Sequence, residues 1–299
     1  MTRTTSGTEL VLTSGDYTAR IVSVGAGLAA LQLDGHDLVV PHRSQDLPRA
    51  WQGKTLVPWP NRITEGTYAF GGERFEVPVN EPGTGAALHG LMGWVDWRIV
   101  HADQDSATLG AFVVPRYGYP WALESWVTYA VHEDTGLSVT ITSTNVGETP
   151  APYGVSQHPF LTLDGRRVDE CELAVPASRV LEVDDRLAPV ALRDVGDLDL
   201  DFREARLLGA QSVDHAFTAL PEEGWEVTLR DPDSGRGVAI ASDAPWVQVY
   251  SGEILDRTGV AVEPMSCAPD AFNTGEGLVV LDPGASHTLT YTVVGTRAE

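Results

Sequence analysis

Positive charge, cysteine and long apolar runs are all scarce in this chain. Lys and Arg number 20 against 42 Asp and Glu, so the formal net charge is −22 at pH 7, and Lys54 is the only lysine. An acidic surface repels the phosphates of nucleic acids and the anionic headgroups of lipids. We therefore expect neither a nucleic acid nor a membrane as a partner.

The two cysteines, Cys171 and Cys267, lie far apart in the sequence. Two cysteines cannot form the disulfide framework of a small secreted domain, which fits a reducing compartment. Residues 1–17 lack the apolar core of a signal peptide, and no run approaches the length of a membrane span. We therefore predict a cytoplasmic protein.

Helical periodicity is nearly absent, and apolar residues instead alternate with polar ones, as in half-buried strands. The strand-like runs are residues 17–24, 28–33, 67–70, 74–79, 97–101, 107–114, 125–131, 137–144, 226–229, 238–241, 247–250, 278–281 and 288–294. Only Phe202–Leu208 suggests a short helix or a turn. The sequence predicts an all-β protein, a large antiparallel β-sandwich or barrel forming a single domain over residues 1–299. Two smaller all-β domains are the alternative.

A glycine pair near the N-terminus, Gly25-Ala26-Gly27, superficially fits a dinucleotide-binding fingerprint. That fingerprint needs a long helix after it, whereas here an alternating strand follows and soon reaches the turn Asp34-Gly35. We interpret the segment as a tight turn between strands and expect no dinucleotide cofactor.

Two polar motifs stand beside rigid or glycine-containing loops. In Pro58-Trp59-Pro60-Asn61-Arg62, the Arg62 guanidinium could donate paired hydrogen bonds to neighbouring hydroxyls, or it could bond to loop carbonyls. In Leu88-His89-Gly90, His89 could face a cleft, although a packed histidine is commoner.

Three further motifs place titratable groups among apolar residues. In Ser156-Gln157-His158-Pro159, His158 suits acid or base chemistry because its pKa lies near neutrality. Asp214, in Val213-Asp214-His215, could accept hydrogen bonds from sugar hydroxyls or form a turn. Glu263 closes an apolar strand before Pro264, where a carboxylate is costly to bury without a partner or a role; an exposed strand end is the alternative.

These side chains could in principle bind a metal ion, since His89, His158, His215 and Glu263 are all metal-ligating types. None of them has a local ligand spacing such as two histidines four residues apart on a helix. We therefore expect no metal.

The order of the motifs along nearly the whole chain resembles the aldose 1-epimerase, or galactose mutarotase, family. The series is Asn61-Arg62, Leu88-His89-Gly90, His158-Pro159-Phe160, Asp214-His215-Ala216-Phe217 and Glu263-Pro264. The resemblance implies a large antiparallel supersandwich that binds a small-molecule sugar and interconverts its α and β anomers.

The same resemblance implies a role for each matching residue. Glu263 would be the catalytic base that deprotonates the anomeric hydroxyl, and His158 the catalytic acid that protonates the ring oxygen. His89 would support the sugar near its ring oxygen. Arg62 and Asp214, with Asn61 beside them, would bind hydroxyls. Ring opening and closure involve no redox change and no phosphate, so no cofactor is expected.

Two alternatives remain open at this stage. A hexose-6-phosphate 1-epimerase would need a basic cluster, for which the pair Arg166-Arg167 is a candidate, although a solvated turn explains it equally. A non-catalytic sugar-binding module on the same fold is the second. The chain departs from well-known members in Leu91-Met92-Gly93-Trp94 and in Ser156-Gln157, so the preferred sugar is open, as is the choice between monomer and homodimer.

Aromatic residues near the motifs could stack on the apolar face of a sugar. Trp94 follows the His89 motif, and Trp246 precedes a strand-like run. Packing in the core is the competing interpretation for both.

Overall fold

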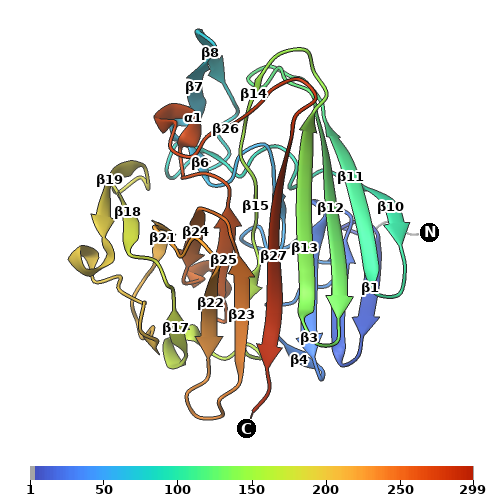
Figure 1. Cartoon of the computed structure of the whole chain (residues 1–299), viewed down its shortest axis with the longest axis vertical. Helices are drawn as coiled ribbons and strands as arrows, with labels where there is room; N and C mark the ends of the chain where they lie inside the picture. Colours follow the sequence, from blue (N-terminus) through green and yellow to red (C-terminus); the bar gives the residue numbers. More distant parts are fainter. Residues whose placement is uncertain (1–3, 299) are drawn as a thin grey trace.

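The computed structural model describes residues 4–298, and within them antiparallel strands dominate (Figure 1). The largest sheet has nine strands. Their order is β10 (Arg98–Ala102), β11 (Ser106–Val113), β12 (Leu123–His132), β13 (Gly136–Asn145), β27 (Ser286–Thr296), β23 (Gly237–Ser242), β22 (Trp225–Arg230), β17 (Glu172–Ala174) and β20 (Arg206–Leu207).

In Figure 1, the four-stranded sheet lies behind the nine-stranded sheet, and the eight-stranded sheet extends from behind it to the left. The four-stranded sheet comprises β1 (Glu9–Ser14), β2 (Tyr17–Val22), β3 (Gly27–Leu33) and β4 (His36–Asp37). The eight-stranded sheet has the path β19 (Pro189–Asp194), β18 (Arg179–Val183), β21 (Asp214–Thr218), β24 (Trp246–Tyr250), β25 (Val260–Met265), β15 (Ser156–Gln157) and β5 (Thr55–Leu56), with β16 (Phe160–Leu161) paired to β25.

Short elements complete the described part of the chain. Three two-stranded ladders pair β6 (Arg62–Ile63) with β9 (Ala87–Leu88), β7 (Thr67–Phe70) with β8 (Glu73–Glu76), and β14 (Ala151–Tyr153) with β26 (Val279–Leu281). The helical turns are α1 (Ala271–Thr274) and the 3₁₀ turns η1 (Thr64–Gly66), η2 (Val168–Glu170), η3 (Val195–Leu198) and η4 (Glu253–Leu255). Among residues 4–298, no helix is long and apolar enough to cross a membrane.

The core lies between the layers and follows from the alternation along the strands. In β12, Leu123, Ser125, Val127 and Tyr129 are buried, whereas the residues that alternate with them are more exposed. The buried polar Gln157 of β15 bridges the layers: its amide donates to the hydroxyl of Tyr129 in β12, and its carbonyl accepts from Tyr291 in β27. A buried amide satisfied in this way fixes β15 against the large sheet.

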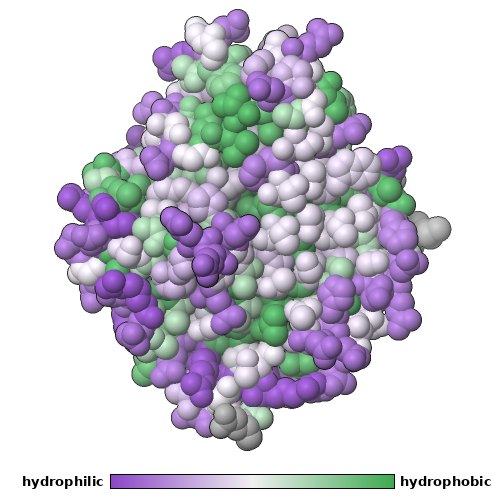
Figure 2. All heavy atoms as spheres, viewed as in Figure 1, coloured by the Kyte–Doolittle hydropathy of each residue, from purple (hydrophilic) through white to green (hydrophobic). Residues whose placement is uncertain are grey.

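The outer face of the nine-stranded sheet is mostly pale in Figure 2, because small hydroxyl residues occupy its exposed positions. Cross-strand hydroxyl pairs run across it, with oxygen separations of 3.0 Å for Thr108–Thr128 and 2.9 Å for Thr142–Thr288. Threonine suits such a pleated surface.

The predicted all-β class and antiparallel sandwich are confirmed. The turn between β7 and β8 consists of Gly71 and Gly72, both at positive φ. Of the two interpretations of residues 202–208, a short helix or a turn, the helix is not formed. That segment contains bends and β20, because Phe202 is buried in the core and residues 206–207 pair with β17.

Candidate active site

A cavity of about 470 Å³ gathers all six predicted site residues, Asn61, Arg62, His89, His158, Asp214 and Glu263. The remaining lining residues are Pro48, Ala50, Trp51, Asn80, Glu81, Leu88, Trp94, Leu187, Gln248, Tyr250 and Ile254. Such a volume falls within the usual range for small-molecule sites.

Three of the polar groups reach the cavity from adjacent strands of the eight-stranded sheet. Gln248 in β24 lies directly opposite Glu263 in β25, and Asp214 begins the neighbouring β21. The valines on either side of Gln248, Val247 and Val249, are buried in the core. Because successive side chains of a strand point to opposite faces, Gln248 and Glu263 lie on the face away from that core.

His158 reaches the same cavity directly after β15. The preceding Gln157 points into the core, so the alternation of the chain turns His158 to the opposite face. The main chain is held on both sides, since His158 N–H donates to the Lys54 carbonyl at 3.1 Å and Gly53 N–H donates to the His158 carbonyl at 2.8 Å.

Arg62 and His89 come from the short ladder of β6 with β9, where Arg62 pairs with Leu88. Asn61 and His89 both adopt positive φ, 52° and 63°, and bind each other: His89 N–H donates to the Asn61 carbonyl, and Asn61 N–H donates to His89 Nδ1. Because Nδ1 accepts, the neutral ring carries its hydrogen on Nε2. A side chain at Gly90 would collide with the Val57 carbonyl, so this motif needs glycine.

A network of charge-assisted bonds fixes Arg62. Its Nε and Nη2 donate to the two carboxylate oxygens of Glu81 at 2.7 and 2.9 Å, and Nη2 lies 3.8 Å from Asp214 Oδ2. Gln248 Nε2 donates to Asp214 Oδ1 at 2.6 Å. Bidentate pairing orients the planar guanidinium, so its remaining donors have a set direction.

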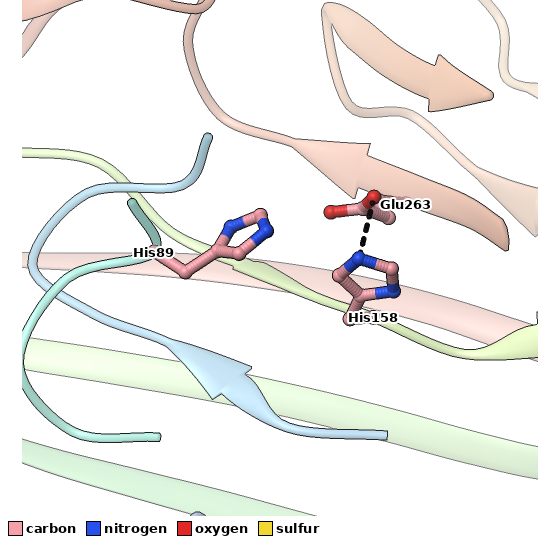
Figure 3. A group of neighbouring side chains, drawn as sticks. All are labelled: His89, His158 and Glu263. Atoms are coloured by element: carbon pink, nitrogen blue, oxygen red, sulfur yellow. Dashed lines mark ion pairs between the residues drawn. The ribbon is translucent and has the colours of Figure 1, made fainter. Parts of the chain in front are cut away.

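The imidazole of His158 contacts the carboxylate of Glu263 at the buried end of the cavity, with 3.3 Å between Nε2 and Oε1 (Figure 3). Both residues are almost fully buried, at 5% and 1% exposed. Glu263 Oε2 and His158 Nδ1 find no hydrogen-bond partner within residues 4–298. Buried polar atoms without a hydrogen-bond partner are candidates to bind the polar groups of a ligand.

Burial shifts the pKa of Glu263 and the pKa values of the two histidines in opposite directions. It raises the pKa of Glu263 well above its usual range, with the nearby Asp214 adding to the effect and Arg62 opposing it. Burial lowers the pKa of His158 to about 3, and it lowers the pKa of His89 well below its ordinary value. Burial therefore favours the uncharged forms of both members of the pair, protonated Glu263 and neutral His158.

The fold also brings together a set of atoms that could hold a divalent cation. Ligand atoms of His89, His158 and Glu263 lie within 4.8 Å of one another. Two imidazoles and a carboxylate are a donor set that Zn²⁺ accepts. The fourth residue of the possible set, His215, does not line the cavity, because it follows Asp214 in β21 and points to the other face.

Sequence reasoning missed several lining residues, among them Trp51, Glu81, Gln248 and Tyr250. The alternation in Val247-Gln248-Val249 places Gln248 away from the core but does not say what it faces. Of the two candidate stacking tryptophans, Trp94 lines the cavity. Trp246 does not, because it is buried in a small cluster with Leu181, Ala216, Met265 and Ala268.

The arginine pair beyond His158 lies outside this cavity. Arg166 pairs with Asp231 and Asp233 at 3.0 and 2.9 Å, and Arg167 pairs with Asp169 at 2.7 Å. Among the described residues that line the cavity, Arg62 is the only Lys or Arg.

Comparison with known proteins links this arrangement to sugar epimerases. The sequence profile described as aldose 1-epimerase matches residues 8–293. The uncharacterised protein YihR of Escherichia coli K12 is 47% identical over 292 residues, which cover 98% of this chain and 94% of YihR. Mouse galactose mutarotase is 29% identical over 216 residues, which cover 66% of this chain and 61% of the mouse protein.

Solved structures share the fold at lower identity. The aldose epimerase homologue from C. elegans superimposes with a TM-score of 0.88 at 23% identity, covering 98% of this chain and 99% of its own. Galactose 1-epimerase from Lactobacillus acidophilus gives a TM-score of 0.82 at 19% identity, with 97% and 95% coverage.

Proposed function

This chain belongs to the aldose 1-epimerase family, and we propose that it interconverts the α and β anomers of a free aldohexose. One observation carries the proposal: the buried contact between His158 and Glu263 in a cavity that also presents Arg62, Asp214, Gln248 and His89. An acid and a base lie side by side, with hydroxyl-binding groups around them.

The reaction requires two proton transfers at neighbouring oxygens. Glu263 takes the proton of the anomeric hydroxyl while His158 gives one to the ring oxygen, and the bond between C1 and the ring oxygen breaks. The two oxygens are bonded to the same carbon, so adjacent acid and base groups suit them. The aldehyde then rotates about C1–C2 and the ring closes with the two roles exchanged. Each positioned proton transfer contributes about 10²–10⁴-fold to the rate.

Burial favours the protonation that one stage of this cycle requires. Ring opening leaves the proton on Glu263 and a neutral His158, and burial favours the uncharged form of each group. The cavity therefore stabilises the state that accompanies the open-chain aldehyde. The ring-closed sugar requires the ionic form, in which the proton sits on His158, and nearby charge and hydroxyls must support it.

The charges of the cavity favour a free sugar over a sugar phosphate. Arg62 donates hydrogen bonds to Glu81 and lies near Asp214. Arg166 and Arg167 pair with carboxylates outside the cavity. A dianionic phosphate would enter a site whose one lining cation is compensated and whose other charged groups are acidic.

The test is anomer exchange measured by NMR on a panel of free aldoses and their 6-phosphates. The proposal predicts exchange faster than the spontaneous rate for at least one free aldohexose, and a weaker effect on its 6-phosphate. Preference for the phosphate would favour the hexose-6-phosphate alternative. Binding without any acceleration would favour a non-catalytic sugar-binding module.

A further inference from the structure

One wall of the cavity consists of aromatic rings in contact. Starting from His158, the ring centroids of His158 and His89 are 5.2 Å apart, those of His89 and Trp51 5.1 Å, and those of Trp51 and Trp94 5.2 Å. Trp94 ends this row and is 48% exposed although it lines the cavity. Leaving so much of an indole in water forgoes the free energy of burying it.

The sole lysine lies behind Trp94. Lys54 is fully buried, its ammonium donates to the Val24 carbonyl at 2.6 Å, and it lies 5.0 Å from the centroid of the Trp94 ring. A cation over an indole face is attracted by the ring quadrupole. Burial of this ammonium costs free energy, which lowers the pKa of Lys54 to about 8. A lysine in this position holds the indole in place.

The backbone around Trp51 is shaped to present its ring to the cavity. Ala50 and Trp51 are consecutive non-glycine residues at positive φ, 48° and 59°. A side chain at Gly93 would come within 2.6 Å of the Trp51 ring, so the indole packs directly on the Gly93 backbone. Strained backbone of this kind is typical of ligand-contacting segments.

We propose that Trp51 and Trp94 form an aromatic subsite for the C–H face of a pyranose ring, and that Lys54 is a positioning residue that acts through Trp94. The subsite deepens the proposed function and rests on it for the identity of the substrate. The same cavity also presents Arg62, Asp214 and Gln248, whose polar groups suit hydrogen bonds to hydroxyls. A pyranose has an apolar face and a polar rim, and the cavity offers one surface for each.

The first experiment separates binding from catalysis. Binding of 1,5-anhydro-D-glucitol and 1,5-anhydro-D-galactitol, which lack the anomeric hydroxyl, is measured by NMR titration of wild type, Trp94→Ala and Trp94→Phe. We expect Trp94→Ala to weaken binding of at least one of them roughly fivefold to tenfold, and Trp94→Phe to weaken it less. Trp126→Ala, which removes a partly exposed tryptophan from the outer face of the large sheet, is the matched control and should bind as wild type.

The subsite is wrong if wild type binds neither compound more tightly than Trp94→Ala does. Because these compounds cannot mutarotate, this result does not depend on epimerase activity. Failure of the proposed function would appear separately, as wild type that binds them but accelerates no free aldose. If the enzyme is active, Trp94→Ala should raise KM by a larger factor than it lowers kcat.

A double-mutant cycle tests the role of Lys54. Lys54→Met keeps an unbranched side chain but removes the charge, and it should raise KM in the wild-type background. In the Trp94→Ala background it should have little further effect, because its action passes through the absent indole. Equal effects in both backgrounds would show that Lys54 only stabilises the fold, and would overturn its assignment as a positioning residue.

Discussion

Replacing the buried Glu263 by glutamine is expected to stabilise the protein increasingly as the pH rises. The side chain is 2% exposed, and Oε2 has no hydrogen-bond partner in the described part of the chain. Burial raises the pKa of Glu263 above the value of about 4.3 in an unfolded chain. For a carboxyl with a raised folded pKa, folding is favoured fully below the unfolded pKa and loses stability as the pH rises toward the folded pKa.

The magnitude follows from the linkage between proton binding and folding. Each pH unit between the two pKa values costs the wild type up to about 1.4 kcal/mol, whereas glutamine does not titrate. Between about pH 5.5 and about pH 7.5, the free-energy advantage of Glu263→Gln should therefore grow as the pH rises, with about 1.4 kcal/mol per pH unit as its upper limit. Urea unfolding of both proteins at the two pH values measures this difference.

Glu81→Gln is the control of opposite sign. Although burial opposes it, the hydrogen bond from Arg62 lowers the pKa of Glu81, so the ionised form stabilises the fold at neutral pH. This variant should lose stability relative to wild type as the pH rises through the normal range of a carboxyl. A stability difference between Glu263→Gln and wild type that does not change with pH would contradict the raised pKa of Glu263.

Three other expectations concern the rate, the core and the arginine pair. The pH profile of kcat/KM should show no inflection near pH 6.5, because burial lowers the pKa of His158 to about 3; a fall between about pH 7 and pH 5 would contradict this lowered pKa. Gln157→Leu should lower the free energy of unfolding by about 1–3 kcal/mol, because it leaves the buried Tyr291 hydroxyl without its acceptor, whereas the Tyr129 hydroxyl keeps the Ala26 carbonyl; unchanged urea unfolding would contradict this. Arg166→Gln should leave KM for the sugar unchanged, because Arg166 lies outside the cavity; a higher KM for a sugar phosphate alone would revive the phosphosugar alternative.

The sheets could be predicted from the sequence wherever strands are long and alternate. The alternation in residues 125–131 and 137–144 marks β12 and β13, and Gly136 at the turn between them adopts positive φ. The short strands β14, β15 and β16 were not predicted, because two or three buried residues show no alternation. They form because distant parts of the chain provide their partners: β15 and β16 pair with β25, and β14 pairs with β26.

The candidate site was predictable only in part. Each histidine motif alone suits a packed residue, and the order of the motifs along the chain made them informative. The order of the motifs could not show which residues contact them in the fold. Glu81 contacts Arg62, Gln248 contacts Asp214, and Trp51 contacts His89. These contacts join segments that are separated by 19, 34 and 38 residues, and no local pattern records them.

The central claim is tested most directly by polarimetry of freshly dissolved α-D-glucose and α-D-galactose with wild type and Glu263→Gln. We expect wild type to accelerate the relaxation of at least one sugar and the variant, although folded and no less stable, to leave it at the spontaneous rate. Relaxation at the spontaneous rate with wild type for every free aldohexose tried would contradict the proposed function, and equal acceleration by the variant would contradict the assignment of Glu263 as the base.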